Sequence, residues 1–120
     1  MANSENILSG QTHPGESSTQ GVTGEMFKGD GFYGRSDGIH TVQYSLEGFI
    51  GSIEIEATLA TEPVDADWFI LTETTHTSIT VDDAEASGAF IKNFTGNYVW
   101  VRATIRNWTD GTVNSVLLNH

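Results

Sequence analysis

The chain has no cysteine, little positive charge and no long apolar run. The absence of cysteine excludes disulfides, thiolate metal sites and cysteine nucleophiles. Five basic residues against sixteen acidic ones give a formal net charge of -11, and binding phosphate requires a basic surface. No run approaches the roughly 18 apolar residues of a membrane span, and the N-terminus lacks the basic and apolar regions of a signal peptide. We therefore expect neither free nucleic acid nor a membrane as a partner.

Catalytic motifs are also missing. The four histidines, His13, His40, His76 and His120, are isolated, and none is spaced from another His or a Glu as metal ligands are. The sequence contains no nucleophile elbow, no HExxH and no phosphate-binding glycine loop. We therefore expect no enzyme, no catalytic residue, no cofactor and no resident metal ion.

Two acidic turns keep one alternative open, a bound calcium ion. Asp65 and Asp67 lie in one turn, and Asp82 and Asp83 with Glu85 lie in another. Carboxylates in turns can coordinate Ca²⁺ in weak sites of the extracellular type. Asp67 could instead accept the hydrogen bond that starts a turn.

Length and composition favour one β domain. The 120 residues suit a single core, and 38% hydrophobic residues with 13 glycines indicate a thin core and many turns. No segment shows helical apolar spacing, whereas seven segments alternate or are rich in β-branched residues. These segments are 39–46, 49–61, 68–72, 75–81, 89–94, 98–106 and 112–118. Asp110-Gly111 is a hairpin signal between the last two.

The pattern predicts an antiparallel β-sandwich or jelly roll of about seven to eight strands, with a small closed barrel as the competitor. Residues 25–120 would form this domain, opening with the glycine-rich stretch 27–38. Residues 1–24 are poor in apolar groups, so we expect a flexible or partner-bound arm. If the arm binds a partner, Ile7 and Leu8 are its anchor.

Charge is distributed unevenly along the chain. Eleven acidic residues and no Lys or Arg lie between Ser36 and Ile91, and the cations Lys92, Arg102 and Arg106 follow. This segregation suits docking against a complementary neighbour, although a solvated acidic face that keeps the protein soluble explains it equally well.

The segment 98–106 has two distinct faces. Alternation assigns its Val and Ala residues and Ile105 to the core, where we also expect Val99, Val101, Ile53, Ile55, Leu59 and Trp68. The other face is an aromatic and cationic stripe, of the kind that stacks on a sugar ring or fills a subunit interface, unless both faces are covered within the monomer. The candidate interface residues are Tyr98, Trp100, Arg102, Arg106 and Trp108, together with Ile7 and Leu8 of the arm.

Four stretches carry a resemblance. They are GFIGSIEIEATLAT at 48–61, EPVDADWF at 62–69, FTGNYVWVRATI at 94–105 and DGTVNSVLLNH at 110–120, and the opening GDGFYGRSDG at 29–38 agrees with them. Over residues 40–120 the chain resembles small virion proteins of tailed phages, especially those of marine cyanobacterial phages. The resemblance implies a protein that is made in the host cytoplasm and incorporated into the virion, with copies of itself and other virion proteins as partners.

Two functions follow as expectations. The first is a non-enzymatic virion structural protein, such as a capsid decoration protein or a neck, tail or fibre-associated subunit, that acts by assembly and forms a homo-oligomer. The alternative is a carbohydrate-binding β-sandwich module for attachment to a host surface, with or without the help of Ca²⁺. The aromatic stripe is compatible with both, since Tyr, Trp and Arg are enriched in binding surfaces.

Overall fold

A computed structural model describes residues 5–12, 20–29, 38–80 and 84–119. These residues form seven strands of one antiparallel sheet and a single 3-10 turn, and they contain no α-helix. The strands are β1 (Glu5–Thr12), β2 (Gln20–Thr23), β3 (Phe27–Lys28), β4 (Ile39–Thr58), β5 (Phe69–Ser78), β6 (Gly88–Thr95) and β7 (Trp100–Asn119), and η1 spans Asp65–Asp67. The all-β class is confirmed. Within this part of the chain, no helix is long and apolar enough to cross a membrane.

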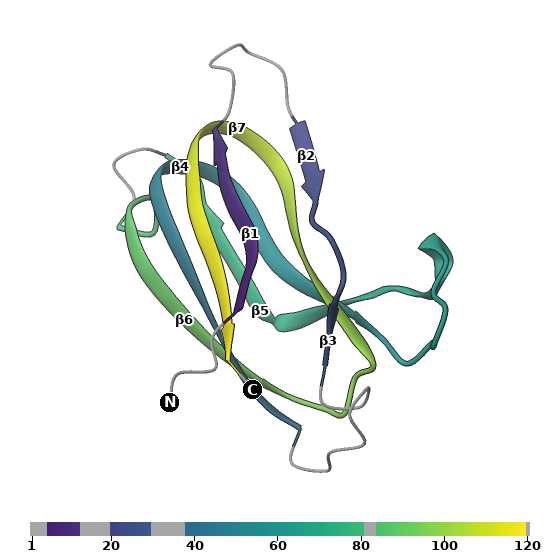
Figure 1. Ribbon diagram of the computed structural model, residues 1–120. Helices are drawn as coiled ribbons and strands as arrows, with labels where there is room; N and C mark the ends of the chain where they lie inside the picture. The colour runs from purple at the N-terminus through teal and green to yellow at the C-terminus, as the bar shows by residue number, and fades with distance from the viewer. Residues whose placement is uncertain (1–4, 13–19, 30–37, 81–83, 120) are drawn as a thin grey trace.

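The sheet folds over into a sandwich because its two longest strands bend. β4 and β7 pair along their whole length, but each half has different outer neighbours. In layer A, the first half of β4 and the last half of β7 lie between β6 and β1. In layer B, the second half of β4 and the first half of β7 lie between β5 on one side and β2 and β3 on the other. Figure 1 shows both long strands curving over at the same end of the molecule.

Glycine makes this bend possible. Gly111 has a φ of 90°, in the left-handed region, and a Cβ there would collide with the backbone of Gly48 on the facing strand. Gly48 is itself left-handed, with a φ of 61°. The register of β4 against β7 shifts between Glu47 and Ser52, as expected where β-bulges bend a strand. The two backbones therefore cross in close contact at the bend.

The predicted hairpin at Asp110-Gly111 is wrong for this reason. The chain passes through Gly111 and continues in the same strand, so segments 98–106 and 112–118 belong to one strand, β7. The segments 39–46 and 49–61 likewise merge into β4, and 68–72 and 75–81 merge into β5. A left-handed glycine is required by a bend as much as by a turn, and the local sequence does not distinguish them.

The core fills the space between the layers. Layer A contributes Val42, Tyr44, Val116 and Leu118, while layer B contributes Ile53, Ile55, Leu71, Val101, Ala103 and Ile105, all at least 95% buried. The Tyr44 side chain reaches from layer A to layer B, where its hydroxyl donates to the carbonyl oxygen of Thr74 in β5 at 2.8 Å. Three predicted core residues are elsewhere: Leu59 is 64% exposed beyond the end of β4, and Trp68 and Val99 are half-buried.

The N-terminal segment is part of the sandwich over its described residues. β1 pairs with the last half of β7, and β2 pairs with its first half. Ile7 and Leu8 are 2% and 7% exposed in the core of the same chain. Residues 5–12 and 20–23 therefore differ from the expected flexible or partner-bound arm. Two inward apolar side chains and a ladder of backbone hydrogen bonds suffice to order a strand of polar composition, whereas residues 1–4 and 13–19 lie outside the described residues.

Candidate functional site

The predicted stripe lies on the outer face of layer B, which we call the charged face. Strand alternation brings Trp100, Arg102 and Arg106 to this face, opposite the glutamates of β4. Arg102 Nε donates to Glu56 Oε1 at 2.9 Å, and the Thr104 hydroxyl donates to the same oxygen at 2.8 Å. Both side chains of this ion pair are mostly buried, at 16% and 17% exposure. The carboxylate of Glu56 is thus shared between two neighbours on β7.

Arg106 forms a second, bidentate pair with Glu54. Its Nε donates to Glu54 Oε1 and its Nη2 donates to Oε2 at 3.0 Å. The Thr75 hydroxyl on β5 also donates to Oε2, at 3.1 Å. These bonds satisfy a carboxylate that is fully buried, and the hydrogen bond from Arg106 to Glu54 raises the pKa of the guanidinium. Both arginines of the stripe therefore have carboxylate partners within the chain.

Two tryptophans border these ion pairs. The Arg102 guanidinium carbon lies 4.1 Å from the centre of the Trp68 ring, a cation–π contact. Trp100 donates its indole N–H to the carbonyl oxygen of Thr61 at 3.1 Å, which ties the loop after β4 to β7. Both rings are half-buried. The aromatic part of the stripe thus packs on its own loop and on its own arginine.

Tyr98 and Trp108 do not join this face. Tyr98 precedes β7 and packs edge-on against Phe69 at 5.7 Å between ring centres, and burial raises the pKa of its hydroxyl. Trp108 was predicted at an interface but is 2% exposed in the core. Asn107 has a left-handed φ of 52°, which interrupts the alternation after Arg106 and turns Trp108 inward. There its indole N–H donates to the carbonyl oxygen of Asp110 at 2.9 Å.

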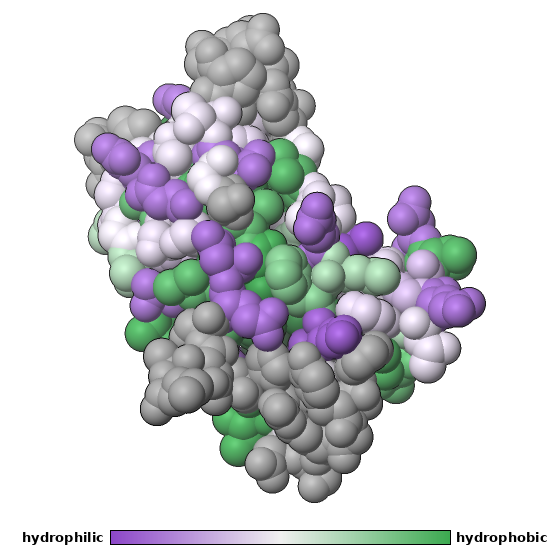
Figure 2. All heavy atoms as spheres, viewed as in Figure 1, coloured by the Kyte–Doolittle hydropathy of each residue, from purple (hydrophilic) through white to green (hydrophobic). Residues whose placement is uncertain are grey.

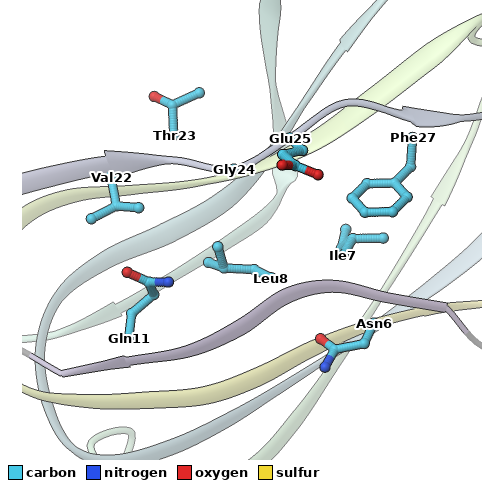
Figure 3. Close-up of a pocket in the computed structure, with 9 residues that line it drawn as sticks. All are labelled: Asn6, Ile7, Leu8, Gln11, Val22, Thr23, Gly24, Glu25 and Phe27. Carbon is cyan, nitrogen blue, oxygen red and sulfur yellow. The ribbon is translucent and has the colours of Figure 1, made fainter.

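A groove opens on the opposite edge of the sandwich, between β1 of layer A and the β2–β3 edge of layer B. Its volume is about 340 Å³, near the lower end of ligand pockets. In Figure 3, Ile7 and Leu8 on β1 point toward Phe27 and Val22 on the other edge. Figure 2 shows apolar surface in the centre of this view with hydrophilic surface around it. The polar side chains of the groove are Asn6, Gln11, Thr23 and Glu25.

The groove combines an apolar floor with amides, a hydroxyl and one carboxylate. No Lys or Arg is among its lining residues, and Glu25 is their only charge. An anionic ligand would find no cation among these residues, whereas the Gln11 amide can both donate and accept hydrogen bonds. The site therefore suits an uncharged polar ligand that also has an apolar face.

The sequence pointed to only part of this groove. Ile7 and Leu8 were singled out as anchor residues and do line it, but on the inside of their own chain. Val22 and Phe27, which line its other side, were not among the candidate binding residues. The groove arises from the pairing of β1 and β2 with different halves of β7, which no local sequence signal specifies.

The acidic turns do not gather ligands among the described residues. In residues 5–12, 20–29, 38–80 and 84–119, no three His, Asp or Glu side chains are placed to hold a metal ion. Asp67 accepts a hydrogen bond from the backbone N–H of Val64 at 2.8 Å, which is the turn role considered for it. Asp82 and Asp83 lie outside the described residues.

No protein-family model matches the sequence, and no curated protein matches it either. Among solved structures, the chain is similar to chitosan-binding module 2 of a chitosanase/glucanase from Paenibacillus sp. IK-5, in complex with chitotriose. That match has a TM-score of 0.51 and 11% identity, and covers 96% of this chain and 80% of the other. A chain from the complex of reduced XRCC1 with the DNA pol beta catalytic domain matches with a TM-score of 0.50 and 10% identity, covering 86% and 75%.

A third solved structure, the carbohydrate-binding module CBM6cm-2 from Cellvibrio mixtus lichenase 5A with cellotriose, has a TM-score of 0.45 and 13% identity, covering 100% and 98%. At these identities, the first two similarities concern the fold and not the site. The chain therefore shares its β-sandwich fold with a module solved with chitotriose and with a chain of a protein–protein complex.

Proposed function

We propose that the chain is a carbohydrate-binding module that holds a sugar in the groove between β1 and the β2–β3 edge. The observation that supports this proposal is the chemistry of the groove, an apolar floor beside amide and carboxylate side chains and no cation. A pyranose ring has apolar C–H faces and a rim of hydroxyls that donate and accept hydrogen bonds. The two kinds of surface match.

Individual residues take distinct roles in this proposal. Phe27 is half-buried, so its ring can contact an apolar sugar face while it remains packed against the core. Gln11 would exchange hydrogen bonds with hydroxyls, and Glu25 would accept them. The chitosan-binding module that shares the fold was solved with chitotriose, which supports the proposal at the level of the fold.

The test is a calorimetric titration of the full chain with cellotriose and with chitotriose. We expect binding in the range of about 10 μM to 1 mM, as for a small groove. Phe27→Leu preserves an apolar side chain but removes the ring, and Gln11→Ala removes an amide. Each should weaken binding about fivefold, because each loses about 1 kcal/mol.

Leu59→Ala is the matched control, since this side chain is exposed and does not line the groove. It should leave the dissociation constant unchanged. Absence of binding to both sugars, or equal binding by Phe27→Leu, Gln11→Ala and the unmodified chain, would overturn the proposal. Backbone amide shifts in residues 5–11 and 22–27 on adding sugar would place the ligand in the groove.

We propose particle assembly as the second function, which the resemblance to phage virion proteins supports. The stretches 48–61 and 94–105 that carry the resemblance contain most of the paired β4 and β7 halves of layer B. In this case the chain would be incorporated in the virion beside copies of itself and other virion proteins. Mass spectrometry of purified particles from a phage that encodes the chain tests it. Peptides of the chain at a stoichiometric level would support assembly, and their absence would contradict it.

A further inference from the structure

The outer face of layer A differs in chemistry from the rest of the molecule, and we call it the uncharged face. Alternate residues of β4, β6 and β7 point outward there, and neighbouring strands bring them together. None of the ten is charged, although the chain has a formal net charge of -11. They are Ile39, Thr41, Gln43, Ser45, Ala89, Ile91, Asn93, Ser115, Leu117 and Asn119. The exposed Glu47, next in the same alternation of β4, lies beyond them at the bend.

This face has both a projection and a hollow. Ile39 is 65% exposed and Ile91 is 63% exposed, more than any other large apolar side chain in the described strands. Next to them lies a shallow hollow of about 110 Å³, lined by Thr41, Gln43, Ile91, Leu117 and Asn119. An exposed isoleucine beside a hollow on one face provides the knob and the hole that a two-fold contact requires.

We propose that the uncharged face is the interface between two copies of this chain. Two molecules that each carry a charge of -11 repel one another, and the repulsion is smallest where contact buries no charge. A nucleic acid or an anionic membrane would require cations, which these ten residues do not contain. A second copy requires none.

The polar groups of the face are also suited to a copy of themselves. Hydroxyls and amides both donate and accept, so a two-fold arrangement can satisfy them with the same groups from the partner. Thr41 donates its hydroxyl hydrogen to Asn93 Oδ1 at 2.8 Å, which fixes the Asn93 amide and directs its N–H groups away from that bond. Flat β surfaces of this composition need no desolvation of ions on contact.

The area of the face sets the expected affinity of the dimer. Seven residues along a strand and three strands across give about 23 Å by 14 Å, or roughly 320 Å² per copy before side chains are counted. Stable interfaces bury about 800 Å² per partner, so this one belongs with weak, reversible contacts. We expect a dissociation constant in the range of about 50 μM to 1 mM.

Sedimentation velocity of the full chain from about 10 μM to 1 mM tests the proposal. The weight-average mass should rise from 13.0 kDa toward twice that value as concentration increases. Added salt should strengthen the dimer, since it screens the repulsion between two acidic molecules and the interface contains no ion pair to weaken. A mass that stays at the monomer value over the whole range would overturn it.

Ile91→Glu places a carboxylate in the interface, opposite the partner's uncharged residues, and should weaken the dimer at least tenfold. Val64→Glu is the matched control, because Val64 is 64% exposed in the loop before η1 and the charge change is the same. Equal dimerisation of both variants would contradict this face as the interface, as would equal loss in both. Ile39→Glu, with its melting temperature checked, serves if Ile91→Glu does not fold.

Discussion

The two outer faces of the sandwich are made from the same two long strands, yet they differ completely in chemistry. On the charged face of layer B, Glu54 and Glu56 pair with Arg106 and Arg102. On the uncharged face of layer A, ten outward residues include no ionisable group. One strand thus presents two different surfaces, one before its bend and one after it. The bend separates a surface that satisfies its own charges from a surface suited to contact with another molecule.

Burial also differs between the two faces. Glu54 is fully buried although it lies on an outer face, because the Arg106 side chain and β5 cover it. Long charged side chains can lie along the strands and shield one another from water. The side chains of Ile39 and Ile91 have no such cover over most of their surface. The charged face is therefore closed by its own side chains, and the uncharged face is open.

The bend itself gives the largest expected effect. Gly111→Ala places a Cβ against the backbone of Gly48 at a positive φ, and we expect a loss of about 3 kcal/mol in the free energy of unfolding. Urea denaturation measures it. Gly10→Ala in β1 is the control, since its Cβ would lie 3.7 Å from the nearest atom, an ordinary contact, and its effect should stay below about 0.5 kcal/mol. Equal losses would contradict strain at the bend.

Breaking one ion pair tests how much the internal ion pairs of the charged face contribute to stability. Arg106→Ala leaves the Glu54 carboxylate buried without its guanidinium partner, which costs 3–5 kcal/mol in fully buried pairs. We expect about 2 kcal/mol, because the Arg106 side chain is 48% exposed and water can replace part of it. Thr41→Ala, on the uncharged face, should cost less than about 1 kcal/mol by the same urea measurement.

The double variant with Arg106→Met and Glu54→Leu sharpens this result. It removes both charges and fills their volume with apolar atoms, so most of the stability lost in Arg106→Ala should return. A double variant as unstable as the single one would mean that the cost comes from packing and not from the unpaired carboxylate.

The smallest effect concerns the hydrogen bond between the layers. Burial raises the pKa of Tyr44 above its usual 10.0, so the folded state favours the neutral phenol. This contribution is complete below about pH 10 and is lost as pH rises toward the folded pKa, by about 1.4 kcal/mol at pH 11. Tyr44→Phe should cost about 1 kcal/mol at pH 7 and reduce the fall in urea midpoint between pH 9 and 11. A small residual slope is expected from Tyr98, and an unchanged slope would contradict the assignment to Tyr44.

Much of the fold was predictable from alternation. The alternation of Ile53 and Ile55 with Glu54 and Glu56 predicted a strand with one apolar and one polar side. The structure places all four residues in β4, as predicted. The stripe of Trp100, Arg102 and Arg106 was also correctly placed on one face. These predictions succeed because strand periodicity is local and depends only on which face meets the core.

The remainder depends on pairing across long distances. Nothing near Asp110 and Gly111 distinguishes a bend in one strand from a turn between two, since the difference lies in Gly48 on the facing strand. β1 forms a strand because it pairs with β7, whose residues lie a hundred or more positions further along the chain. Trp108 faces inward because Asn107 adopts a left-handed conformation at the bend. The groove follows from these pairings, and therefore its residues could not be grouped from sequence.

The pairing of β1 with the last half of β7 has a consequence for how the molecule forms. Glu5 lies opposite Leu118, so the first strand of the sheet meets a partner from the other end of the chain. Topologies with such high contact order fold slowly, because the entropy of a large loop is lost before the contact is gained. During synthesis, β1 has no neighbour until β7 leaves the ribosome. Layer A therefore closes last, and until then the apolar side chains of β1 are exposed to any other strand nearby.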